Sequence, residues 1–133
     1  MSAYGSILPF EQATNTFVSE AYEHRTFFSR LHHFVLVSDA FVVVPGGIGT
    51  VLELAMIWQL LQVRGLQRTP LILIGRMWAD LVAWARQALL NSEFPLANPE
   101  DLEIPKCVGS AAEAIAMIRE RYEEWTREAE RTE

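Results

Sequence analysis

The sequence PGGIGTVLE, residues 45–53, combines residue types that suit the binding of a phosphorylated molecule. Three glycines within four positions let the backbone adopt positive φ angles and approach a ligand without obstruction by β-carbons. A helix is predicted to follow directly, so its first N–H groups and its positive end would attract an anion. The alternative is a purely structural turn between strand and helix. We predict a phosphate site formed by Pro45, Gly46, Gly47, Ile48, Gly49 and Thr50.

Glu53 is the one carboxylate in a predicted helix that is otherwise almost entirely apolar and runs to Val63. A carboxylate in such surroundings is costly unless it is paired or lines a cavity. Thr50 lies three residues earlier, about 60° away around the helix, so both side chains are expected to face the glycine turn. Glu53 is either a carboxylate of the site or a residue that only favours the helix N-terminus electrostatically.

The composition excludes several classes of protein. The 133 residues suit one compact domain, and half of them are hydrophobic. A net charge of −6 with scattered basic residues argues against nucleic acid as a partner. A single cysteine fits a reducing compartment, and no apolar run is long enough to cross a membrane, so we expect a cytoplasmic protein without a membrane partner.

Strand-like and helix-like segments alternate along the chain. The first fifteen residues read as a loop or one edge strand, and an apolar period of helical type runs over residues 16–34. Strands are predicted at 40–45, 70–75 and 103–108. The first two are expected to be buried, and the first of them on both faces. Helices are predicted after the glycine turn, at 77–90 and from Ser110, which would act as an N-cap with Glu113 three residues later.

The alternation of strands and helices predicts a Rossmann-like three-layer α/β/α fold with a mostly parallel sheet. Ligands of such sheets bind beyond the carboxyl ends of the strands, where the PGGIGT turn lies.

The segment PGGIGTVLE resembles the PGGxGTxxE signature of the Lonely Guy family, the cytokinin riboside 5′-monophosphate phosphoribohydrolases formerly called lysine decarboxylases. Upstream, TFFSRLHHFVLVSDAF, residues 26–41, is similar to the arginine-lysine helix that leads into the same strand of that family. The family arginine aligns with Arg30 and its glutamate with Glu53. Leu31 replaces the family lysine, and the first glycine-rich loop of the family has no counterpart. We therefore expect residues 1–133 to form a single, partial domain of this family, truncated on its N-terminal side.

The resemblance implies hydrolysis of the N-glycosidic bond of a nucleoside 5′-monophosphate, which releases a base and ribose 5-phosphate. It assigns the catalytic roles to Arg30 and Glu53, places the 5′-phosphate on residues 45–50 and requires no cofactor. It also implies a homodimer or a higher homo-oligomer, in agreement with an exposed sheet edge. The alternatives are a non-catalytic nucleotide or phosphate-binding module and an oligomeric assembly module that has lost activity.

Other kinds of chemistry are poorly supported by the sequence. A pyridoxal phosphate enzyme needs a Schiff-base lysine, and the only lysine, Lys106, adjoins no glycine-rich phosphate cradle. The adjacent histidines His32 and His33 point about 100° apart on a helix, so we expect no metal site there. Cys107 lies in an apolar strand, where we expect a buried small hydrophobic residue rather than a nucleophile.

Overall fold

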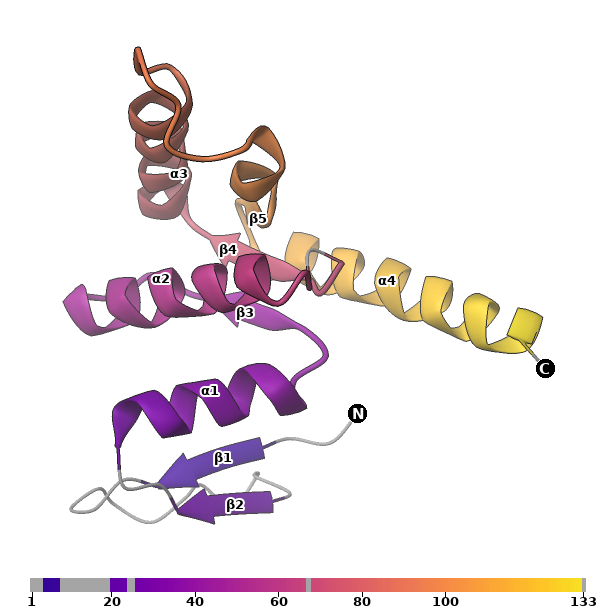
Figure 1. The fold of residues 1–133 in the computed structure, drawn as a ribbon. Helices are drawn as coiled ribbons and strands as arrows, with labels where there is room; N and C mark the ends of the chain where they lie inside the picture. The colour runs from indigo at the N-terminus through magenta and orange to yellow at the C-terminus, as the bar shows by residue number, and fades with distance from the viewer. Residues whose placement is uncertain (1–3, 8–19, 24–25, 67, 133) are drawn as a thin grey trace. The chain divides into compact units, whose positions relative to one another are not determined.

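The computed structural model describes residues 4–7, 20–23, 26–66 and 68–132 of the chain (Figure 1). The chain divides into two compact units, residues 1–38 and residues 39–133. The candidate phosphate turn and Glu53 both belong to the second unit, which therefore contains most of the predicted site.

In the first unit, strand β1 (Tyr4–Ile7) pairs in parallel with strand β2 (Glu20–Glu23), and helix α1 spans Phe27–Val37. The helix predicted over residues 16–34 is therefore wrong in its first part, because residues 20–23 form a strand; residues 16–19, 24 and 25 lie outside the described residues. The helix begins where Thr26 caps it, its hydroxyl accepting the N–H of Ser29 at 3.1 Å.

The second unit contains an open parallel sheet with the strand order β3–β4–β5. Its strands are β3 (Phe41–Val43), β4 (Leu71–Ile74) and β5 (Pro105–Val108). Helix α2 (Ile48–Val63) joins β3 to β4, helix α3 (Arg76–Leu90) and the short 3-10 helix η1 (Pro99–Glu103) lie between β4 and β5, and helix α4 (Ala111–Thr132) follows β5. This arrangement confirms the predicted Rossmann-like α/β fold with a parallel sheet (Figure 1).

The core of the second unit is built around the central strand. Leu71, Ile72 and Leu73 of β4 are completely buried, because α3 and α4 both pack against β4 and β5. Helix α3 adds one buried face made of Trp78, Val82 and Ala85, as its apolar spacing predicts.

Strand β3 differs from the prediction that both of its faces are buried. Phe41 is buried, but Val42 is 44% exposed. Within the second unit β3 has β4 on one side only, so it is an edge strand. A run of β-branched residues indicates a strand but does not reveal whether the strand is central.

Helix α4 begins as the sequence predicts. The Ser110 hydroxyl accepts the N–H of Glu113 at 3.2 Å, and the Glu113 carboxylate accepts the N–H of Gly109 at 2.7 Å. From β5 the helix runs outward to the end of the chain (Figure 1). Among the described residues, no helix is long and apolar enough to cross a membrane.

Candidate functional site

The PGGIGT turn connects the carboxyl end of β3 to the start of α2, the edge of the sheet at which ligands of this fold class bind. All residues from Pro45 to Gly49 are exposed, and Ile48 is 85% exposed although it is apolar. The turn is therefore open to a ligand from solution.

The glycines of the turn do not take the positive φ angles expected from the sequence. Gly47 has φ −95°, and neither Gly46 nor Gly49 has a positive φ; among the described glycines only Gly65 and Gly75 do. Residues other than glycine can adopt this backbone conformation, so any requirement for glycine in the turn must come from the space around its α-carbons.

The three glycines of the turn differ in the space available for a β-carbon. A β-carbon on Gly46 would collide with the hydroxyl of Thr50 and lie 2.9 Å from its β-carbon. At Gly47 and Gly49 nothing lies within 4 Å of the position that a β-carbon would take. Gly46 is therefore required by close packing inside the turn, whereas Gly47 and Gly49 leave the backbone uncovered on its outer side.

The first turn of α2 offers backbone N–H groups that could bind an anion. Gly47 is the N-cap and provides no side-chain hydrogen bond, and the first helical bond runs from the N–H of Val51 to the carbonyl of Gly47 at 3.1 Å. The N–H groups of residues 48–50 precede this bond and have no acceptor within the helix. Aligned N–H groups at a helix N-terminus, next to an uncovered backbone, form a typical anion cradle.

Glu53 and Thr50 line one groove of about 420 Å³ together with Leu54 and Ile57 of α2 and with residues 40–44 of β3 and its flanks. Thr50 and Glu53 thus line the same groove, as their predicted common orientation requires. Val44 and Thr50 flank the glycine turn, so the groove ends at the turn.

Glu53 is half-buried in this groove and is the sixth residue of α2. The interaction of a charge with the helix dipole falls off within the first turn, so this position weakens the purely electrostatic explanation of Glu53.

The strand wall of this groove was not among the predicted site residues. Residues 40–44 contribute because β3 has an unpaired side within its own unit, which leaves room beside α2. The sequence carried no signal for this wall, because an apolar β-branched run does not reveal whether a strand is central or at an edge.

Arg30 lies on α1 in the first unit, half-buried. Because Glu53 belongs to the second unit, the predicted role of Arg30 beside Glu53 stays a prediction. Leu31, which stands where the resembled family has lysine, is 6% exposed and adds no charge.

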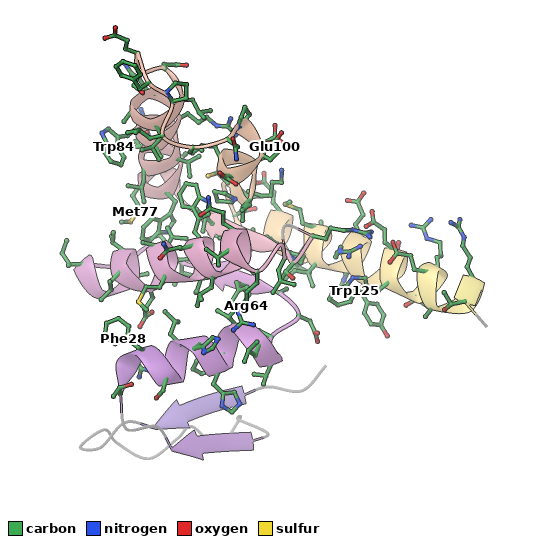
Figure 2. All side chains as sticks on the ribbon, viewed as in Figure 1. Phe28, Arg64, Met77, Trp84, Glu100 and Trp125 are labelled. Atoms are coloured by element: carbon green, nitrogen blue, oxygen red, sulfur yellow. The ribbon has the colours of Figure 1, made fainter. Side chains whose placement is uncertain are left out.

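A larger groove of about 490 Å³ lies between α2, α3 and the segment around η1. Its walls are mainly apolar and include Trp58, Leu81 and Trp84, whose exposed side chain is visible on α3 (Figure 2). None of Arg30, Glu53 and residues 45–50 lines it. We therefore place the candidate chemistry in the smaller groove, which contains Thr50 and Glu53.

Among the described residues, no group of three or more histidine, cysteine, aspartate or glutamate side chains could hold a metal ion. Lys106 is exposed on β5, which is separated from β3 by the central strand. The lysine and the glycine turn thus lie on different strands of the sheet.

Cys107 is exposed on β5, so the expected burial of this residue is wrong. Strand β5 is the other edge of the described sheet, and its two consecutive residues Lys106 and Cys107 are both exposed. Partial desolvation nevertheless raises the pKa of the Cys107 thiol, an effect that the nearby Arg86 opposes.

Alkylation of Cys107 by iodoacetamide is expected to be slower near neutral pH than alkylation of a cysteine in a short unstructured peptide. A raised pKa leaves less thiolate at a given pH, and the thiolate is the reactive form. The measurement is the second-order rate as a function of pH, with the urea-unfolded protein as control. A folded rate that levels off at a lower pH than the unfolded rate would contradict the assigned pKa direction.

The sequence profile described as possible lysine decarboxylase matches residues 3–118. No curated protein sequence matches the chain. The profile match covers most of the chain, and it agrees with an open parallel sheet that carries a glycine turn at a strand end. The protein belongs to this family, whose domain is that of the Lonely Guy proteins.

Proposed function

We propose that this protein binds a nucleoside 5′-monophosphate and hydrolyses its N-glycosidic bond. Family membership supports a nucleotide-binding, phosphoribohydrolase-like role at the level of the family. The observation that carries the proposal for this chain is the open turn at residues 45–50, which ends in the groove that contains Thr50 and Glu53. The phosphate-binding turn and the Glu53 carboxylate would then act on the same small molecule.

The proposed chemistry follows from the groups at the groove. The N–H groups of residues 48–50 and the Thr50 hydroxyl bind the 5′-phosphate, which fixes the ribose relative to Glu53. Cleavage of the N-glycosidic bond develops positive charge on the sugar, and the Glu53 carboxylate stabilises that charge or accepts a proton from the attacking water. Water adds to the anomeric carbon as the base departs with a proton, so the products are a free base and ribose 5-phosphate. Arg30 is proposed to orient the substrate.

Pyridoxal phosphate chemistry does not fit these residues, despite the description that the family carries. Such an enzyme needs a lysine that forms a Schiff base beside a phosphate cradle. The only lysine of the sequence is exposed on β5, and the cradle proposed here follows β3. We therefore include no cofactor in the proposal.

A non-catalytic nucleotide-binding module is the second candidate function. It is favoured by Leu31, which is buried and uncharged where the resembled family has a lysine. Such a module would bind the same ligands without releasing a base.

The first test is a thermal-shift titration with AMP, other nucleoside 5′-monophosphates and ribose 5-phosphate on the wild type and on Gly47→Val. Gly47 has an extended conformation and open space at its α-carbon, so valine fits the fold but covers the N–H groups of the turn. We expect the wild type to be stabilised, by about 2.7 kcal/mol at a hundredfold excess of ligand over Kd, and the variant not to respond.

Gly47→Ala is the matched control because its smaller side chain enters the same open space and should keep most of the affinity. No response of the wild type to any of these ligands would refute phosphate binding by this chain. An equal response of wild type and Gly47→Val would place the phosphate elsewhere.

A further inference from the structure

Gly75 lies where the carboxyl ends of all three strands of the second unit meet. It follows β4 directly, and its N–H donates to the carbonyl of Val108 at the end of β5 at 3.1 Å. Its φ is +117°, and a β-carbon on it would lie 3.0 Å from the Cγ atom of Pro45, the first residue of the glycine turn. Gly75 thus needs to be glycine both for its conformation and for its contact with Pro45.

Trp78 makes a second connection to the same turn, from the first turn of α3. Its side chain is completely buried, and its indole Nε1–H donates to the carbonyl of Val44 at 3.3 Å. The N–H of Trp78 also donates to the carbonyl of Gly75 at 3.2 Å, which couples the two residues through the start of the helix. Val44 directly precedes Pro45, so both residues act on the point at which the chain enters the turn.

The turn has little else within the unit to hold its entrance. The side chains from Val44 to Gly49 are exposed, with Val44 59% exposed, so burial of these side chains does not fix the backbone. An anion site built from backbone N–H groups works only when these groups keep their positions to within about 0.5 Å and their directions to within about 10–20°. The required rigidity has to come from neighbouring elements.

We infer that Gly75 and Trp78 are positioning residues of the phosphate site, acting through Val44 and Pro45 on the N–H groups that follow. This inference rests on the proposed function for its effect on ligands, but its effect on the turn itself is independent of any ligand. It assigns a role in ligand binding to the junction between β4 and α3, which contains none of the site residues predicted from the sequence.

The test uses Trp78→Phe, which keeps an aromatic ring but removes the indole donor, and Gly75→Ala, which presses a methyl group against Pro45. Val82→Ala is the matched control. Val82 lies about one helical turn further along α3 and is 7% exposed, and no described hydrogen bond joins it to the glycine turn. Two quantities are measured for each protein in the full chain: the Kd for ribose 5-phosphate by calorimetry, and the amide ¹H and ¹⁵N shifts of Gly46, Gly47 and Gly49.

We expect both positioning variants to change the shifts of the turn glycines and to raise the Kd about tenfold, as the loss of one oriented hydrogen bond would. The control should keep the wild-type Kd and glycine shifts even though its melting temperature falls. Such a split separates positioning from a general loss of stability. Should Trp78→Phe fail to fold, Gly75→Ala provides both readouts on its own.

Unchanged glycine shifts and an unchanged Kd in the folded variants would overturn the inference. Equal effects of Val82→Ala on both readouts would also overturn it, because the role would then be structural only. If the wild type binds neither ribose 5-phosphate nor any of the nucleoside 5′-monophosphates, the proposed function fails, whereas the glycine shifts still decide whether Gly75 and Trp78 position the turn.

Discussion

Replacement of Glu53 by glutamine is expected to lower the rate of base release from a nucleoside 5′-monophosphate by about 10²–10⁴-fold. Glutamine has almost the same shape as glutamate and fits the half-buried position in the groove beside Thr50. It cannot offer a negative charge to the developing positive sugar or accept a proton from water. The affinity for ribose 5-phosphate should change little, because the proposed site binds the phosphate through the turn rather than through Glu53.

The measurement is chromatographic detection of the free base over time, at a substrate concentration chosen from the binding titration. Glu120→Gln is the control, since Glu120 is an exposed carboxylate on α4 and should leave the rate unchanged. Retention of full activity by Glu53→Gln would remove Glu53 from the mechanism. A wild type that binds the nucleotide but never releases a base would instead favour the non-catalytic module.

Substitution of Gly46 by alanine is expected to reduce both the stability of the protein and its affinity for phosphate ligands. The new methyl group would collide with the hydroxyl of Thr50 and approach its β-carbon to 2.9 Å, and a β-branched residue in the first turn of a helix has little freedom to move away. Overpacking of this kind costs about 1–3 kcal/mol. The displacement also disturbs Thr50 and the N–H groups near it, so we expect the Kd to rise at least about tenfold.

Urea unfolding and calorimetric titration measure the two effects separately. Gly47→Ala is the control one residue away, where the conformation is extended and no atom lies within 4 Å of the new methyl group. That control should stay within about 1 kcal/mol of the wild type, because the restriction of the unfolded chain by alanine offsets part of the preference of the N-cap position for glycine. If the two alanine variants behave alike, the packing of Gly46 against Thr50 is not what the turn requires.

Much of the second unit follows from local patterns that act independently of the rest of the chain. Strand β4, helix α3 and the start of α4 at Ser110 agree with the predicted ranges, because apolar spacing and a capping hydroxyl specify these elements over short distances. The first unit shows where such patterns fail. Apolar residues at helical spacing before Thr26 predict a helix, yet residues 20–23 pair with β1, and pairing with a distant segment overrides local preference.

The candidate site shows the same division. The sequence by itself determined the class of protein and singled out the glycine turn and Glu53 as candidates for its site, since residue types and close spacing are sufficient to recognise the family motif. It misjudged why the glycines are there, because a backbone angle and an atomic collision depend on exact coordinates.

Only the tertiary structure decided that β3 is an edge strand within the described part of its own unit, that its residues form a groove with Thr50 and Glu53, and that Gly75 and Trp78 reach the entrance of the turn. These relations join residues that are far apart in the chain. They arise because parallel strands bring their carboxyl ends to one edge of the sheet, where a helix N-terminus, a carboxylate and a supporting core residue from different segments meet.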